Sequence, residues 1–255
     1  MIAFRDVYKK FGPKQVLSGF SLQVPDGQTT VVIGYSGTGK SVALKHIVGL
    51  LEPDGGQVEV DGQVVHELDR QGLVTLRSQV GFVFQFAALF DSMTVRENIA
   101  LGLKRQQVPP HEIEFRVRES LELVDMDGTQ DRYPIELSGG MRKRVGIARA
   151  IALKPKYILY DEPTSGLDPV TSSVINGLMV RAREKLGVTG LVVTHDMSSA
   201  YMVGDRIAML YRGAIRQVGT VEEIQRTHDP IVRQFIEGRP EAADDAESAV
   251  AQVQS

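Results

Sequence analysis

Short apolar stretches typical of β-strands dominate the first third of the chain. Residues 16–24 alternate loosely between apolar and polar positions, as in a strand with one buried face. Residues 29–33 are almost continuously apolar, which predicts a strand buried on both faces. A helix is expected over residues 42–51. A hairpin is expected over residues 57–65, turning at Asp61-Gly62.

The pattern becomes helical from residue 94 to about residue 126. Apolar positions there step by four, four and three residues, at Ile113, Val117, Leu121 and Val124. A further helix is expected to end near residue 153. The stretch 86–153 is therefore a candidate helical subdomain inserted into the fold.

Strands and helices alternate again in the last third of the chain. The expected elements are a strand over 157–161, a helix over 169–186, a strand over 190–194, a short helix reaching residue 200 and a strand over 206–211. Such alternation predicts an α/β fold with a mostly parallel core sheet, to which the N-terminal residues add an antiparallel β subdomain.

Composition is ordinary for a globular protein and excludes several functional classes. The 255 residues carry 29 basic and 32 acidic side chains, a net charge of −3, so no overall positive field exists to attract nucleic acid. Cysteine is absent, which excludes disulfides and thiolate metal sites. The N-terminal residues do not resemble a signal peptide, and no stretch is apolar enough to span a bilayer. If the protein works at a membrane, other subunits must supply the spanning part.

Gly34-Tyr-Ser-Gly-Thr-Gly-Lys-Ser41 fits the phosphate-binding pattern G-x-x-x-x-G-K-[ST] between a predicted strand and a predicted helix. Its glycines let backbone N–H groups turn toward phosphates, and the helix that follows presents its positive end to the same anion. Lys40 is expected to neutralise the β- and γ-phosphates, and the Ser41 hydroxyl to bind Mg²⁺.

Two adjacent carboxylates complete this chemistry. Asp161 ends the predicted strand 157–161 and is the candidate metal-side carboxylate. Glu162 follows it and is the candidate general base for an attacking water. Adjacent acids on a loop are often solvated charges, but the buried strand before them favours a functional role.

Further motifs, in order along residues 1–225, resemble those of the ABC (ATP-binding cassette) ATPases. The shared motifs are Gln85, Leu137-Ser-Gly-Gly-Met141, Tyr160-Asp-Glu-Pro-Thr164, Ser165-Gly-Leu-Asp168 and Thr194-His-Asp196. The resemblance implies a P-loop NTPase cassette that forms a dimer around two Mg-ATP and drives a membrane permease.

The resemblance also implies roles for individual residues. Those implied to bind ATP are Phe11, Gly34, Tyr35, Ser36, Gly37, Thr38, Gly39, Lys40, Ser41, Gln85 and Asp161. Those implied to act on the nucleotide of the partner copy are Ser138, Gly139, Gly140 and Asp168. Glu162, His195 and Lys40 are implied to be catalytic, and Ser41, Gln85 and Asp161 to hold Mg²⁺. Phe11 would stack on adenine, or it would instead pack in the β subdomain.

Three segments are similar to the ATPases of Mla/Mce-type phospholipid transport systems: residues 34–42, 137–145 and 230–238. This narrower resemblance implies a peripheral subunit on the cytoplasmic face of the inner membrane, working to maintain outer-membrane lipid asymmetry. Its implied partners are a second copy of the chain, a polytopic permease, an MCE-domain lipid-binding protein and a small STAS-like accessory subunit. The alternative is a soluble ABC ATPase of a non-transport complex, such as iron–sulfur assembly or cell division.

Three features leave alternatives open. The basic side chains between Arg142 and Arg149 are read as a solvated or dimer-facing surface, not as a nucleic-acid site. The apolar run 86–90 fills the helical core or receives a permease helix. Residues 226–239 are expected either to dock on a neighbouring subunit or to pack on their own domain. The residues that follow, 240–255, are expected to form an acidic and flexible tail.

Overall fold

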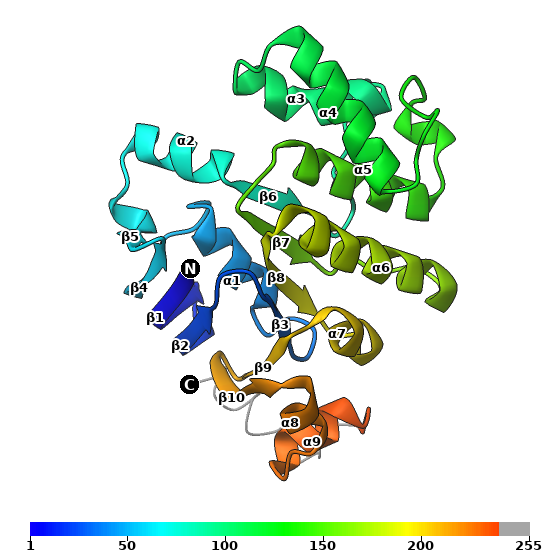
Figure 1. Cartoon of the computed structure of the whole chain (residues 1–255). Coiled ribbons are helices and arrows are strands. Elements are labelled where there is room, and N and C mark those ends of the chain that lie inside the picture. The colour runs from blue at the N-terminus through cyan, green and yellow to red at the C-terminus, as the bar shows by residue number, and fades with distance from the viewer. Residues whose placement is uncertain (240–255) are drawn as a thin grey trace.

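Two β-sheets form the frame of the protein, and the computed structural model describes residues 1–239 of it (Figure 1). The expected acidic tail, 240–255, lies outside the described residues. The smaller sheet is antiparallel, in the order β2 (Lys14–Val24), β1 (Ile2–Phe11), β4 (Gly55–Val60), β5 (Gln63–Val64). The larger sheet runs in the order β10 (Ala214–Thr220), β9 (Arg206–Tyr211), β3 (Thr29–Ile33), β8 (Thr189–Thr194), β7 (Tyr157–Asp161), β6 (Val80–Val83). Its strands are parallel except for the edge strand β10.

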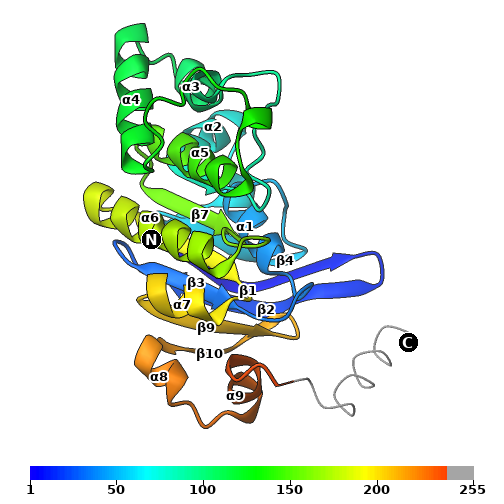
Figure 2. The same cartoon turned by 90° about the vertical axis from the view of Figure 1, so that its right-hand side faces the viewer.

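The helices divide between the sheets and a separate helical layer (Figure 2). The described α-helices are α1 (Lys40–Ile47), α2 (Arg70–Ser78), α3 (Val95–Arg105), α4 (Pro110–Leu123), α5 (Gly139–Ala152), α6 (Pro169–Leu186), α7 (Met197–Val203), α8 (Val221–Gln225) and α9 (Pro230–Ile236). Short 3₁₀ turns cover Val65–Glu67 and Pro134–Glu136. Helices α3, α4 and α5 pack on one another, and α5 also packs on β6.

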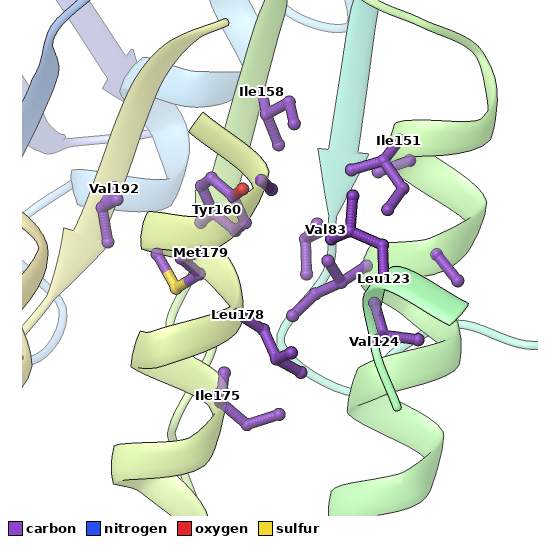
Figure 3. Close-up of a cluster of buried hydrophobic side chains, with 14 of the residues drawn as sticks. Val83, Leu123, Val124, Ile151, Ile158, Tyr160, Ile175, Leu178, Met179 and Val192 are labelled. Carbon is purple, nitrogen blue, oxygen red and sulfur yellow. The ribbon is translucent and has the colours of Figure 1, made fainter. Parts of the chain in front are cut away.

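Both faces of the parallel strands of the larger sheet are buried, and alternate residues of these strands belong to different cores, whereas the edge strand β10 is largely exposed or half-buried. In β3, Val32 packs with the smaller sheet and α1, whereas Val31 and Ile33 pack with the helices on the other side. Figure 3 shows that second core, where Tyr160 and Val192 meet side chains of α6. This two-sided burial explains the continuous apolar runs of the parallel strands.

The predicted fold class is confirmed, and several boundaries agree with the expected ones, notably those of β3, β7, β9 and α6. The expected helix 42–51 is displaced, because α1 begins at Lys40 and ends at Ile47, ahead of Gly49 in the left-handed region (φ +61°). The pattern of apolar and polar residues did not predict α2 or β6. A four-residue strand such as β6 carries too few positions to show a period.

Candidate functional site: the carboxyl edge of the parallel sheet

The phosphate loop is the turn between β3 and α1. Gly34, Gly37 and Gly39 have φ values of 157°, 79° and 104°. At Gly39 an added Cβ would also lie 2.8 Å from Cγ1 of Val16, so both backbone and space require glycine there. The β1–β2 hairpin that carries Phe11 therefore passes directly against the loop.

Lys40 is buried at the centre of this loop. Its ammonium donates to the carbonyls of Gly34 (2.7 Å) and Tyr35 (3.1 Å) and lies 3.5 Å from Oε1 of Glu162. Burial lowers the pKa of Lys40, and the nearby carboxylate opposes that shift. The phosphate loop thus holds the Lys40 ammonium among oxygen atoms and close to backbone amides, an arrangement suited to binding a polyphosphate.

Ser41 and Asp161 come together from different elements. The Ser41 hydroxyl, in the first turn of α1, donates to Oδ1 of Asp161 at 2.6 Å. Asp161 is the last residue of β7, and burial raises the pKa of its carboxyl group. Hydroxyl and carboxylate oxygens are ligands that Mg²⁺ prefers, and Mg²⁺ commonly uses few protein ligands together with phosphate oxygens. Within residues 1–239 there is no group of three or more His, Cys, Asp or Glu side chains that could hold a metal ion.

Glu162 follows Asp161 in a left-handed conformation, with φ of 46°. Its Oε2 lies 2.9 Å from Nδ1 of His195, and the His195 backbone N–H donates weakly to the same oxygen (3.4 Å). Because β7 and β8 are adjacent and parallel, the residues after their carboxyl ends meet at one edge. The carboxylate of Glu162 therefore lies between the Lys40 ammonium and the His195 ring.

Gln85 approaches the same edge from β6. Its side-chain amide donates to the Ser165 hydroxyl over a long 3.4 Å. Ser165, Glu162 and His195 also line part of a cavity of about 400 Å³ beside the site.

The expected lid lies at the start of α5 and faces outward. Ser138 caps this helix, its hydroxyl accepting from the N–H of Met141 at 3.3 Å, and Ser138 and Gly139 are exposed. At Gly140 a Cβ would come within 2.6 Å of the Thr171 methyl group, so glycine allows α5 to approach α6. Asp168 caps α6 by accepting from the N–H groups of Val170 and Thr171, and the Thr171 hydroxyl is the main cause of its lowered pKa.

The reading of the basic cluster on α5 as a solvated surface is wrong for two of its members. Lys143 is only 6% exposed and donates to the Glu162 carbonyl at 3.3 Å. Arg149 is largely buried, and its guanidinium donates to the carbonyls of Ala88 (2.6 Å) and Ala87 (2.7 Å). Helical spacing alone did not reveal that these side chains point toward the sheet and the loop after Gln85.

The apolar run after Gln85 divides between the two alternatives. Ala87 is buried and Leu89 packs against the core, whereas Phe86 is 86% exposed and Phe90 about half exposed. Ala87 and Ala88 both have positive φ values, 60° and 48°, a conformation that costs free energy for residues other than glycine. The bonds from Arg149 hold this turn, which presents the Phe86 ring to the outside.

A buried polar network lies beside the site, and the sequence analysis did not predict it. The Ser199 hydroxyl donates to Asp196 at 2.6 Å and accepts from the Asn176 amide at 2.9 Å. Thr164 Oγ1 lies 3.2 Å from the same hydroxyl. The network ties the segment after β7 to the segment after β8. Thr164 and Asp196 end motifs that the sequence shows, whereas Asn176 and Ser199 are single polar residues inside helices that no motif marks.

Phe11 lies at the end of β1 with its ring half exposed, 5.8 Å from the Lys9 ammonium. It does not belong to the buried core of the β subdomain, so its ring is accessible for stacking, and adenine contact stays a proposal. Among residues 1–239, no helix has the length and apolarity required to cross a bilayer.

The sequence and structure of this chain were compared with those of known proteins, and the matches show its family. Residues 17–165, more than half of the chain, match the family model described as ABC transporter. The chain belongs to the ABC transporter family. It is an ABC ATPase that binds and hydrolyses ATP with Mg²⁺, the ATPase subunit of a transport complex.

Two relatives have similar levels of identity over most of the chain. The chain is 40% identical to a probable ribonucleotide transport ATP-binding protein of Mycobacterium leprae, covering 93% of this chain and 69% of the relative. It is also 40% identical to the chloroplastic protein trigalactosyldiacylglycerol 3 of Arabidopsis thaliana, covering 93% and 74%. Among solved structures, a dimeric ATP-binding cassette in a post-hydrolysis state with ADP and Pi matches with a TM-score of 0.79 and 33% identity, covering 87% of this chain and 99% of the other.

Proposed function

We propose that this ABC ATPase energises phospholipid transport of the Mla/Mce type, from the cytoplasmic face of the inner membrane. The observation that carries the proposal is the 40% identity, over 93% of the chain, to a relative whose name contains a glycolipid, trigalactosyldiacylglycerol. The Mla/Mce-like segments 34–42, 137–145 and 230–238 support it. The equally similar ribonucleotide relative makes ribonucleotide the competing cargo.

For the chemistry, we assign one role to each group at the sheet edge. Glu162 takes the proton of the attacking water, and His195, 2.9 Å away, holds that carboxylate in place. Lys40 neutralises the β- and γ-phosphates, while Ser41, Asp161 and Gln85 hold Mg²⁺. Mg²⁺ held by these residues would supply positive charge to the phosphate oxygens.

For the dimer, the exposed start of α5 acts on the partner copy. Ser138, Gly139 and Gly140 offer a helix N-terminus to the γ-phosphate bound in the other cassette, and Asp168 lies beside them on α6. Two nucleotides then add contacts that exist only in the closed dimer, so ATP favours closure by its differential affinity. Hydrolysis removes that link and permits reopening.

For the permease, the exposed rings next to Gln85 form the docking surface. Phe84, Phe86 and Phe90 are 38%, 86% and 53% exposed. Three large apolar side chains within seven residues suit an amphipathic helix of a membrane subunit. An MCE-domain protein and a STAS-like subunit would complete such a complex.

The test is co-purification followed by transport. The membrane complex that co-purifies with the tagged chain is reconstituted in liposomes, and ATP-dependent transfer of fluorescent phospholipid is compared with uptake of labelled ribonucleotide. The proposal expects a polytopic membrane subunit and lipid transfer that stops without ATP. Recovery of only soluble partners, as in iron–sulfur assembly or cell division, would contradict transport, and ribonucleotide uptake alone would contradict the lipid cargo.

A further inference from the structure

The second residue of the phosphate loop touches the C-terminal helix. The rings of Tyr35 and Phe235 meet edge to face, with centroids 4.9 Å apart and planes at 84°. Two hundred residues separate them in sequence. Both rings are partly buried against the core cluster that covers the helical side of the larger sheet.

Helix α9, which carries Phe235, is held on its own cassette. Asp229 caps it by accepting from the N–H groups of Ile231 and Val232, and also pairs with Arg216 of β10 at 2.8 Å. Val232 is completely buried in the same core. Seven residues are too few for a stable isolated helix, so these contacts define where α9 lies. Figure 2 shows α8 and α9 next to β10, at the edge of the larger sheet.

Packing on its own domain was one of the two alternatives for residues 226–239, and it describes α9 here. Docking of the exposed part of this segment on a neighbouring subunit stays a proposal.

The backbone of Tyr35 is hydrogen-bonded to Lys40. Its carbonyl accepts from the Lys40 ammonium at 3.1 Å and from the Thr38 hydroxyl at 2.8 Å. The Tyr35 peptide is therefore held from two sides, by its ring on α9 and by its carbonyl within the loop. If the Tyr35 ring moved, the Tyr35 peptide group would rotate with it. The backbone N–H groups of the phosphate loop would then shift.

We infer that Phe235 is a positioning residue for ATP binding, which holds the phosphate loop in its binding conformation through the ring of Tyr35. Helix α9 then stabilises the conformation of the phosphate loop, although the two lie near opposite ends of the sequence. This role is separate from the cargo and would hold for any transported substrate.

The test measures the affinity of the full-length chain for Mg-ATP by calorimetry, together with hydrogen exchange of residues 34–40. Phe235→Ala is expected to weaken ATP binding about fivefold, the scale of a lost aromatic pair, and to speed exchange in the loop. Phe235→Tyr keeps the ring and should restore both values. Ile236→Ala, which removes a neighbouring apolar side chain of α9, is the matched control and should leave ATP affinity unchanged.

Phe235→Leu separates positioning from folding, because it fills the apolar space without an aromatic edge. The inference expects normal thermal stability with ATP affinity reduced about threefold. If Phe235→Ala unfolds α9, this variant decides the question. ATP affinity and loop exchange that equal the wild type in Phe235→Leu, or equal losses in Ile236→Ala, would overturn the inference.

Discussion

The phosphate-binding edge of the sheet and the loop after Gln85 are built in opposite ways. At the edge, polar groups meet one another directly, as in Ser41 with Asp161 and Glu162 with His195. In the loop, the outward groups are phenyl rings, and the charged group that supports them, Arg149, lies beneath. The proposed chemistry thus uses side chains that meet at the sheet edge, and the proposed docking surface is shaped by a partly buried side chain beneath it.

The largest expected effect is the loss of ATP hydrolysis, caused by a substitution that leaves the loop after Gln85 unchanged. Glu162→Gln should lower ATP turnover by about 100-fold or more, since it removes the proposed base while keeping its shape. Steady-state phosphate release measures this, and ATP affinity should persist. Glu184→Gln, an exposed change on α6, is the control, and turnover within tenfold of the wild type would exclude Glu162 as the base.

The next change breaks docking and spares the chemistry. Phe86→Asp places a charge at the most exposed ring and should reduce permease recovery about 30-fold, as expected for an interface hot spot. Basal ATPase activity of the isolated chain should not change. Phe115→Asp, at an exposed ring of α4, should leave recovery intact. Equal recovery for both variants would place the permease elsewhere.

A substitution at Arg149 tests whether the hidden cation shapes the loop. Arg149→Lys replaces the planar guanidinium, which places one nitrogen on each carbonyl, with a single nitrogen on a different stem, and should lower the free energy of unfolding by about 1–3 kcal/mol. Adding Ala88→Gly removes the cost of a left-handed alanine and should recover about 1 kcal/mol.

Chemical denaturation measures both changes at Arg149. Arg118→Lys, exposed on α4, is the control. If Ala88→Gly gives no recovery, the turn is not under strain.

The smallest expected effect concerns stability at the metal-side carboxylate. Burial raises the pKa of Asp161 in the folded chain, so the ionised carboxylate destabilises that state at neutral pH. Asp161→Asn should therefore raise the free energy of unfolding of the nucleotide-free chain by about 0.5–2 kcal/mol at pH 7.

This gain should shrink as pH falls through the raised pKa of folded Asp161 and should vanish below about 3.9, the usual pKa of aspartate, where both states of the wild type are protonated. Denaturation at several pH values measures it, with exposed Asp127→Asn as control. A pH-independent difference would contradict burial as the cause.

The sequence predicted the sheet edge better than the helical layer, for physical reasons. Continuous apolar strands and fixed motif spacing determine β3, β7 and the residues that follow them. The contacts of Lys143, Arg149 and Asn176 depend on how α5 and α6 are rotated against the sheet, which local pattern does not encode. The contact between Tyr35 and Phe235 depends on a helix too short to leave a clear period.

We propose that each ATP lies between two copies, with the phosphate loop from one and the helix N-terminus from the other. Lys40→Ala disables the phosphate loop and Ser138→Arg disables the lid, so each variant alone should be inactive. Mixed dimers would contain one intact site of two, so an equimolar mixture in the assembled complex should regain up to about a quarter of wild-type ATPase sites. A mixture as inactive as its components, with mixed dimers shown to form, would place both parts of each site in one chain and contradict the account.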